Sequence, residues 1–129
     1  MAKVLFVCLH NAGRSQMSQA LFTLAAGGAH EARSAGTSPA RRVHPAVVAA
    51  MKEVGVDLSG NLPTQLSTEL AQWADLVVTM GCGDSCPVIP GKRYIDWELT
   101  DPKDLPLAEV REIRGDIQRR VNELVQSLG

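Results

Sequence analysis

The stretch that most restricts the fold lies near the start of the chain, where an unbroken apolar run ends in a polar loop. The run is KVLFVC, residues 3–8. Branched and aromatic residues on both faces are typical of a strand buried on both sides of a parallel sheet. The next segment has apolar residues at helical spacing, such as Met17 and Leu21, and ends at Gly27 and Gly28, where helices favour glycine. This order of strand, polar loop and helix indicates an α/β fold.

The rest of the chain repeats the alternation of strands and helices. We expect strands over His30–Thr37, Asp75–Met80 and Lys92–Trp97, and helices over His44–Val56, Leu66–Trp73 and Pro106–Leu128, the last interrupted at Gly115. Ser67 is placed to cap the short helix. The alternation implies right-handed crossovers and a parallel sheet with helices on both faces. A chain of 129 residues is expected to form one domain, residues 1–129.

Charge and cysteine content exclude several function classes. The formal net charge is −1 with acids and bases interleaved, so no basic field is available for nucleic acid or an anionic membrane surface. The first residues hold one lysine and a short apolar run without a cleavage site, which predicts a cytoplasmic protein. Three cysteines cannot all pair, and without an export signal we expect them to stay reduced, for catalysis, redox exchange or metal binding.

The polar loop after the first strand has the composition of an anion-binding site. A strand that ends at Cys8 and a helix that opens at Arg14 force the loop into a tight curl, so its N–H groups can point inward. The N–H groups expected to bind a tetrahedral oxyanion are those of Leu9, His10, Asn11, Ala12, Gly13 and Arg14. The Arg14 guanidinium adds a planar fork of donors, and we call this set the oxyanion cradle. Gly13 allows close backbone approach, while Asn11 can adopt left-handed geometry or brace the loop through its amide.

Cys8 borders the oxyanion cradle and is the candidate nucleophile. A helix N-terminus and a nearby guanidinium favour the thiolate form of a cysteine, and Ser15 is placed to donate a hydrogen bond to the sulfur. A thiolate beneath a bound oxyanion can attack it. The alternative is an ordinary buried cysteine beside an Asn/Gly turn, because short motifs often match by chance. The preceding strand and the following helix favour the functional interpretation.

The motif CLHNAGRS, residues 8–15, resembles the C-x5-R-S phosphate loop of the low-molecular-weight protein tyrosine phosphatases and of the arsenate reductases built on that fold. The similarity continues through residues 34–37, 44–60 and 75–87, so it covers nearly the whole chain. Gln16, the residue after the arginine-serine pair, resembles the reductases in this position, since the phosphatases typically carry a proline there. The resemblance implies a flavodoxin-like three-layer fold, with a four-stranded parallel sheet flanked by helices, and an arsenate reductase activity.

Cys82 and Cys86 follow the third expected strand, at the same sheet edge as Cys8. Three interpretations of this pair are open: two buried thiols, half of a zinc site that His10 would join, or a redox pair. The zinc site is the weakest of them, because the sequence has no companion metal-binding motif. In the thioredoxin-linked reductases that the chain resembles, one cysteine attacks arsenate, a second attacks the first and releases arsenite, and a third forms the disulfide that thioredoxin reduces.

The resemblance maps these three roles onto Cys8, Cys82 and Cys86, with no bound cofactor. The family's last two cysteines are usually more widely spaced than here. The form GCGDSCP, residues 81–87, also resembles reductases that use an external thiol such as mycothiol, with mycoredoxin as the partner. The source of the reducing equivalents therefore stays open between thioredoxin and a small thiol.

Asp101 precedes Pro102 in a segment that resembles the Asp-Pro loop whose aspartate protonates the leaving oxygen in this family. A carboxylic acid suits this role because a nearby bound anion favours its protonated form. The alternative is a plain Asp-Pro turn, and Asp96 and Asp104 are lesser candidates for the acid. Lys103 stands where the phosphatases usually carry an aromatic residue. Some thioredoxin-linked members hold a cation on acidic ligands beside the loop, but Gln19 occupies the matching position, so no metal is predicted.

The sequence thus predicts a monomeric arsenate reductase with Cys8, Arg14, Ser15, Asp101, Cys82 and Cys86 as its catalytic residues. Arsenate is the expected substrate, and phosphate or sulfate are the expected competing oxyanions. Two alternatives stay open at this point, namely a phosphatase that forms a phosphocysteine and a non-catalytic module that senses oxyanions or redox state.

Overall fold

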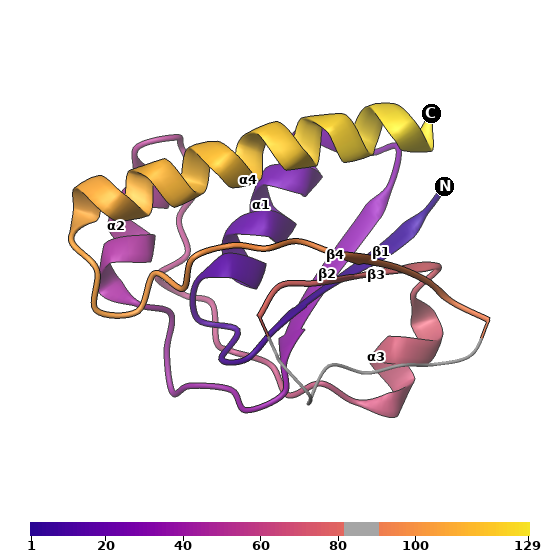
Figure 1. Ribbon diagram of the computed structural model, residues 1–129, viewed down its shortest axis with the longest axis horizontal. Helices are drawn as coiled ribbons and strands as arrows, with labels where there is room; N and C mark the ends of the chain where they lie inside the picture. Colours follow the sequence, from indigo (N-terminus) through magenta and orange to yellow (C-terminus); the bar gives the residue numbers. More distant parts are fainter. Residues whose placement is uncertain (82–90) are drawn as a thin grey trace.

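The described residues of this computed structural model are 1–81 and 91–129, and they form a four-stranded parallel sheet with strand order β2-β1-β3-β4 (Figure 1). The strands are β1 (Lys3–Cys8), β2 (Glu31–Gly36), β3 (Leu76–Thr79) and β4 (Arg93–Asp96), and the helices are α1 (Arg14–Ala26), α2 (Pro45–Lys52), α3 (Thr68–Trp73) and α4 (Leu107–Leu128). The predicted α/β class, a parallel sheet between helices, is confirmed.

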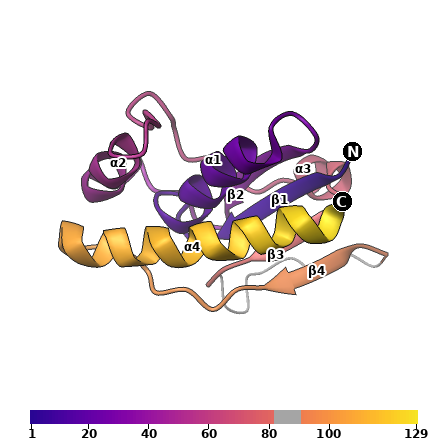
Figure 2. The same cartoon turned by 90° about the horizontal axis from the view of Figure 1, so that it is seen from above.

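Successive side chains of β1 enter different layers of the fold. Val4 and Phe6 belong to the core beneath α1, α2 and α4, whereas Leu5 and Val7 belong to a smaller core beneath α3. Figure 1 shows α1 and α4 on one side of the sheet and α3 on the other, and Figure 2, a view from above, shows α4 in front of the strands. Because side chains alternate along a strand, Cys8 shares the side of Phe6 and faces the start of α1.

Two residues that the sequence predicts at helix ends, Ser67 and Gly27, do lie at the ends of α3 and α1. The Ser67 hydroxyl accepts a hydrogen bond from the Leu70 N–H at 3.1 Å and caps α3. Gly27 closes α1 in the left-handed conformation, with φ of 55°. The helix predicted over 44–56 is shorter, because the Val56 N–H donates back to the Met51 carbonyl at 3.0 Å and α2 ends at Lys52.

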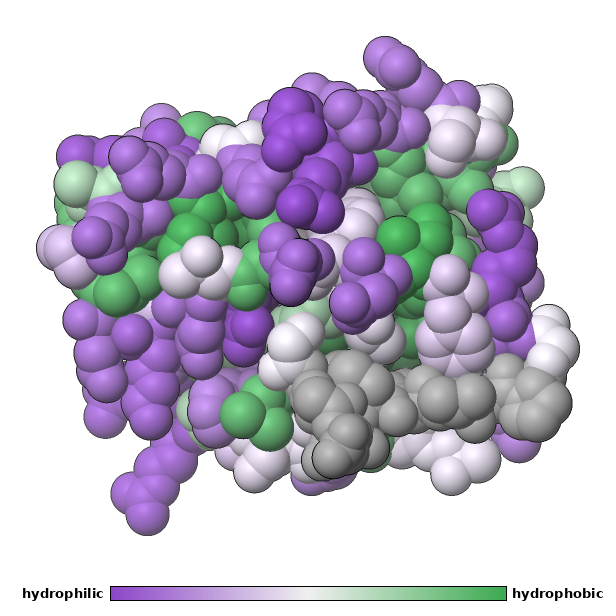
Figure 3. All heavy atoms as spheres, in the orientation of Figure 1, coloured by the Kyte–Doolittle hydropathy of each residue, from purple (hydrophilic) through white to green (hydrophobic). Residues whose placement is uncertain are grey.

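The predicted interruption of the last helix at Gly115 is wrong, since α4 runs through it without a break. A helical glycine costs about 1 kcal/mol relative to alanine. The buried face of α4, which packs against α1 and α2, outweighs that cost; it consists of Val110, Ile113, Ile117, Val121 and Leu124. Figure 3 shows hydrophilic side chains along the edge of the molecule where α4 lies. No helix among the described residues is long and apolar enough to cross a membrane.

A cluster of ion pairs ties the end of α2 to α4. Arg111 donates to the Glu53 carboxylate from Nε at 3.0 Å and from Nη2 at 2.6 Å, and Arg114 Nη1 donates to Glu53 Oε1 at 2.7 Å. The hydrogen bonds from Arg111 and then Arg114 lower the pKa of Glu53 from 4.5 to about 2. A carboxyl with a lowered pKa stabilises the fold fully above pH 4.5 and loses that contribution as the pH falls through about 2.

We expect Glu53→Gln to lower the free energy of unfolding slightly at pH 7 and by less at pH 3, where the wild-type protein has already lost part of this contribution. Urea unfolding at the two pH values measures the difference. Glu123→Gln is the matched control, because the pair that Glu123 forms with Arg119 at 4.0 Å is exposed. An equal decrease at both pH values would contradict the assigned titration of Glu53.

Candidate active site

The loop between β1 and α1 is held from outside by backbone bonds from residues 37–44. The donors are the N–H groups of Thr37, Ser38, Ala40 and His44, and the acceptors are the carbonyls of Cys8, Leu9, His10 and Ala12, at 3.2, 2.8, 3.0 and 2.9 Å. In a planar trans peptide the N–H points away from the carbonyl. Because these carbonyls are bonded outward, the N–H groups of Leu9, His10, Asn11 and Gly13 face the opposite side, toward the inside of the loop.

Asn11 fixes the shape of the loop from within. Its φ of 50° lies in the left-handed region, and its side chain is fully buried. The Asn11 Oδ1 accepts a hydrogen bond from the Thr64 N–H at 2.8 Å, which ties the loop to the segment before α3. Both expectations for Asn11, left-handed geometry and an amide brace, are confirmed.

The Cys8 sulfur lies among hydrogen-bond donors at the base of the loop. The Asn11 N–H donates to Cys8 Sγ at 3.2 Å, and Ser15 Oγ lies 2.9 Å from the same sulfur. Cys8 is 2% exposed and Ser15 is fully buried. The sulfur therefore has two hydrogen-bonding neighbours, one from the loop and one from the first turn of α1. The predicted contact between Ser15 and Cys8 is present.

The first turn of α1 opens onto the same loop. The helix begins at Arg14, and its N-cap residue Gly13 supplies no side-chain hydrogen bond. The N–H groups of the first turn are therefore not capped by that side chain and can serve an anion. A Cβ on Gly13 would lie 2.5 Å from Pro102 Cγ, so the absence of a side chain lets the segment after β4 pack directly on the loop.

The Arg14 guanidinium is buried at the side of the loop, with 7% of its side chain exposed. Its Nη2 lies 3.5 Å from Asp101 Oδ2, and its Nη1 donates to the Leu99 carbonyl at 3.5 Å. Gly81, with φ of 88°, packs against it, and a Cβ there would collide with the guanidinium. The end of β3 and the segment after β4 together fix the direction of the fork. The structure thus brings Arg14 and Asp101 together at the loop that begins at Cys8.

Asp101 lies next to Arg14 at the surface of the protein. Its side chain is 41% exposed, and its Oδ1 accepts a hydrogen bond from the Lys103 N–H at 3.0 Å. The neighbouring His44 has a pKa below 6.5, first because burial disfavours its charge and also through His10, although the Asp101 carboxylate acts in the opposite direction. His44 is therefore mainly neutral at pH 7, and Arg14 supplies the positive charge beside the loop.

Cys82 and Cys86 lie outside the described residues. Strands β1 and β3 are parallel neighbours, so the chain leaves β3 at the sheet edge where the loop stands. The predicted convergence of the three thiols stays a prediction.

Gln19 is engaged in bonds to the neighbouring strand β2. Its Oε1 accepts from the Ser34 hydroxyl at 2.6 Å, and its Nε2 donates to the Ala32 carbonyl at 3.4 Å. Within residues 1–81 and 91–129, no group of three or more His, Cys, Asp or Glu side chains could hold a metal ion. These bonds give Gln19 a structural role in the packing of α1 on β2.

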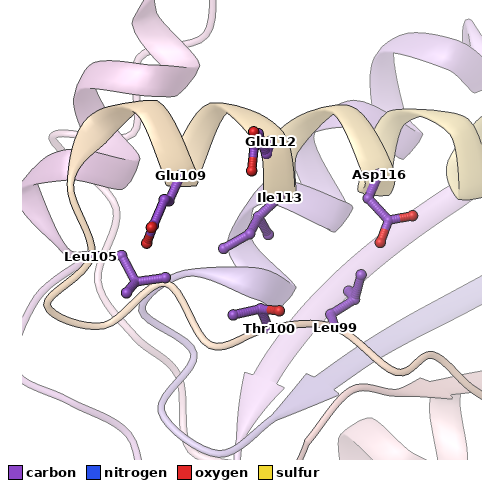
Figure 4. Close-up of a pocket in the computed structure, with 7 residues that line it drawn as sticks. All are labelled: Leu99, Thr100, Leu105, Glu109, Glu112, Ile113 and Asp116. Carbon is purple, nitrogen blue, oxygen red and sulfur yellow. The ribbon is translucent and has the colours of Figure 1, made fainter.

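A separate pocket of about 400 Å³ lies between α4 and the segment that follows β4 (Figure 4). Its lining consists of Leu99, Thr100, Leu105, Glu109, Glu112, Ile113 and Asp116. Figure 4 shows the three acidic residues coming from α4, above Leu99 and Thr100. Carboxylates repel oxyanions, so this pocket is not the oxyanion site.

Three residues that contact Arg14 or Asn11 are not among the predicted site residues, namely Gly81, Leu99 and Thr64. Two of them act through the backbone, which leaves no signal in the sequence. A glycine directly after a buried strand was the available sign for Gly81, because such a position favours close approach at the sheet edge.

Comparisons with known proteins agree with this geometry. The family model for low molecular weight phosphotyrosine protein phosphatase matches residues 3–129. A glutaredoxin arsenate reductase of Synechocystis sp. is 34% identical over 131 residues, 99% of each protein. The structure of a thioredoxin-dependent arsenate reductase of Corynebacterium glutamicum is 44% identical with a TM-score of 0.82; the match covers 98% of this chain, which spans 60% of that one. An arsenate reductase in a phosphate-binding state is 33% identical with a TM-score of 0.88, over 100% of both chains.

Proposed function

The chain belongs to the low molecular weight phosphotyrosine protein phosphatase family, and within that family we propose that it reduces arsenate to arsenite. The observation that carries the proposal is the Cys8 sulfur at the base of an inward-facing amide loop, with the buried Arg14 guanidinium beside it. The N–H groups of the oxyanion cradle and the fork of Arg14 bind the oxygens of arsenate. Phosphate and sulfate, which have the same tetrahedral shape, compete for this site.

In the first step the Cys8 thiolate attacks the arsenic atom. A sulfur–arsenic bond forms and an arsenic–oxygen bond breaks. Asp101 is the acid that protonates the departing oxygen, which leaves as water. Its contact with Arg14 places the carboxyl beside the bound anion, and its 41% exposed side chain can take up a proton from solvent. Ser15 stabilises the thiolate before attack through its hydrogen bond.

In the second step the Cys82 thiolate attacks the Cys8 sulfur. The new disulfide forms as the sulfur–arsenic bond breaks, and the electron pair of that bond reduces As(V) to As(III), which leaves as arsenite. The Cys86 thiolate then attacks Cys82 and frees Cys8. This relay is supported by the resemblance of the three cysteines to those of the thioredoxin-linked reductases and by the thioredoxin-dependent relative.

The reductant that resets the relay is a protein or small thiol, and thioredoxin is the one we propose. The name of the Corynebacterium relative supports thioredoxin, and the name of the Synechocystis relative supports the glutaredoxin class. Mycothiol with mycoredoxin is the alternative that the spacing of Cys82 and Cys86 suggests. Such reductants keep thiols reduced in the cytoplasm, where we expect the protein to act as a monomer.

A single-turnover experiment tests the proposal. Fully reduced protein is mixed with arsenate without any external thiol, and the arsenite formed and the thiols lost are counted. We expect about one arsenite and two lost thiols per chain, followed by recovery of the thiols with thioredoxin. Arsenite that appears only after mycothiol or glutathione is added would move the reduction step to that external thiol. No arsenite with any thiol, together with hydrolysis of an aryl phosphate, would make the protein a phosphatase.

A further inference from the structure

A continuous row of side-chain hydrogen bonds leads from the surface to the candidate nucleophile. Asn61 Nδ2 donates to Gln16 Oε1 at 3.2 Å, and Gln16 Nε2 donates to Asn11 Oδ1 at 3.1 Å. Asn11 Nδ2 then donates to Ser15 Oγ at 2.6 Å, and Ser15 Oγ lies 2.9 Å from Cys8 Sγ. Asn61 is exposed, whereas Gln16 is only 4% exposed. We call Asn61, Gln16, Asn11 and Ser15 the amide relay.

The direction of every bond in the amide relay follows from one fixed donor. The Thr64 N–H can only donate, so the Asn11 atom that it contacts at 2.8 Å must be the oxygen. The other end of that amide is therefore the nitrogen, which must donate to Ser15. Because the Ser15 oxygen accepts this bond, its own proton is free to point at the Cys8 sulfur.

The same reasoning fixes the outer half of the relay. Asn11 Oδ1 is an acceptor, so the Gln16 atom that faces it is the nitrogen, and the Gln16 oxygen faces Asn61. All four donors thus point toward the sulfur. Hydrogen bonds aligned in one direction polarise one another, most strongly in a buried site where the local dielectric is low.

We propose that Gln16 is a positioning residue that keeps the Cys8 thiolate reactive: as the second donor to the Asn11 oxygen beside the Thr64 N–H, it holds Asn11 and Ser15 in their donating orientation, with Asn61 as the outer end of the amide relay. This inference rests on the proposed function, in which Cys8 is the nucleophile. It assigns a role to Gln16 and Asn61, whose hydrogen bonds lead to the sulfur through Asn11 and Ser15. Gln16 and Asn61 also line one polar pocket of about 460 Å³, so solvent reaches the outer end of the relay.

In the part of the chain that the structure describes, charged and titratable groups at the loop stay unchanged in this test. They include Arg14 on α1, Asp101 after β4, and the histidines His10 and His44. A change in the reactivity of Cys8 in a Gln16 variant therefore reports on the amide relay.

Alkylation of Cys8 by iodoacetamide tests the proposal, in full-length protein that carries Cys82→Ser and Cys86→Ser so that one thiol remains. Gln16→Met keeps the length of the side chain and removes both hydrogen-bonding groups. We expect alkylation at pH 7 to slow about tenfold and the midpoint of its pH dependence to move upward, as for the loss of one well-placed hydrogen bond. Phosphate protection against alkylation should keep its half-maximal concentration within about twofold, since the oxyanion cradle is retained.

Gln19→Met is the matched control, because Gln19 lies on the same helix and bonds to Ser34 and Ala32 outside the amide relay.

Asn61→Ala is the second test variant, and its exposed site tolerates truncation. It should shift the midpoint of the pH dependence in the same direction, with about a twofold to threefold lower alkylation rate at pH 7. Unchanged midpoints in Gln16→Met and Asn61→Ala, or an equal shift in Gln19→Met, would overturn the proposal. If Gln16→Met does not fold, Asn61→Ala decides alone. Alkylation needs no arsenate, so this result is independent of the single-turnover test.

Discussion

The Cys8→Ser variant is expected to form no detectable arsenite from arsenate, a loss of at least about 10⁴-fold. A serine hydroxyl keeps its proton at neutral pH and does not form a disulfide. The variant therefore lacks both the nucleophile that binds arsenic and the sulfur that returns electrons to it. The measurement is arsenite formed per chain by reduced protein with arsenate and thioredoxin, compared with the wild-type protein.

Binding and folding should survive this substitution. Cys8 is buried, and the Asn11 N–H and Ser15 that contact its sulfur can also bond to a serine oxygen. The oxyanion cradle keeps its amides and Arg14, so phosphate should raise the melting temperature of the variant as much as that of the wild-type protein. Ser15→Ala is the companion variant; it retains the nucleophile and should only slow the reaction. Arsenite formation by Cys8→Ser above about 1% of the wild-type rate would contradict Cys8 as the nucleophile.

The sheet could be predicted from the sequence because its central strands are nearly uniform in polarity. Leu5, Val7 and Val77 are apolar on the face beneath α3, and Val4 and Phe6 are apolar on the other face. Such runs have few alternatives to a buried strand. Gly115 was misjudged because the cost of a glycine is a local quantity, whereas the burial of the α4 face depends on tertiary packing.

The candidate site was predictable only where its residues are close in sequence. Cys8, Asn11 and Ser15 lie within one loop and helix start, and their mutual bonds follow from that geometry. Contacts across more than fifty residues, such as Thr64 to Asn11 or Gly81 to Arg14, depend on which loops meet at the sheet edge. Those contacts orient the amide of Asn11 and the guanidinium of Arg14. The sequence therefore indicates which groups take part in the chemistry, whereas the tertiary fold determines their orientation.

Arg14→Lys is expected to lower kcat/KM for arsenate by about 10² to 10³-fold, the loss typical of removing a preorganised donor from an oxyanion site. The Arg14 fork is buried and fixed by Asp101, the Leu99 carbonyl and Gly81. Lysine keeps the charge but offers a point donor on a flexible stem, so it cannot contact two oxygens of the substrate at once. Because the fork binds arsenate both before and during attack, KM should rise and kcat should fall together.

The control for Arg14→Lys is Arg111→Lys, which makes the same chemical change at the α2–α4 ion-pair cluster. That variant should keep both kinetic parameters within about twofold, since Arg111 contacts Glu53 and not the loop. Phosphate should stabilise Arg14→Lys against heat much less than it stabilises Arg111→Lys. If Arg14→Lys kept kcat/KM within about threefold of the wild-type value, two-oxygen recognition by the guanidinium would be excluded, and the loop amides alone would have to hold the substrate.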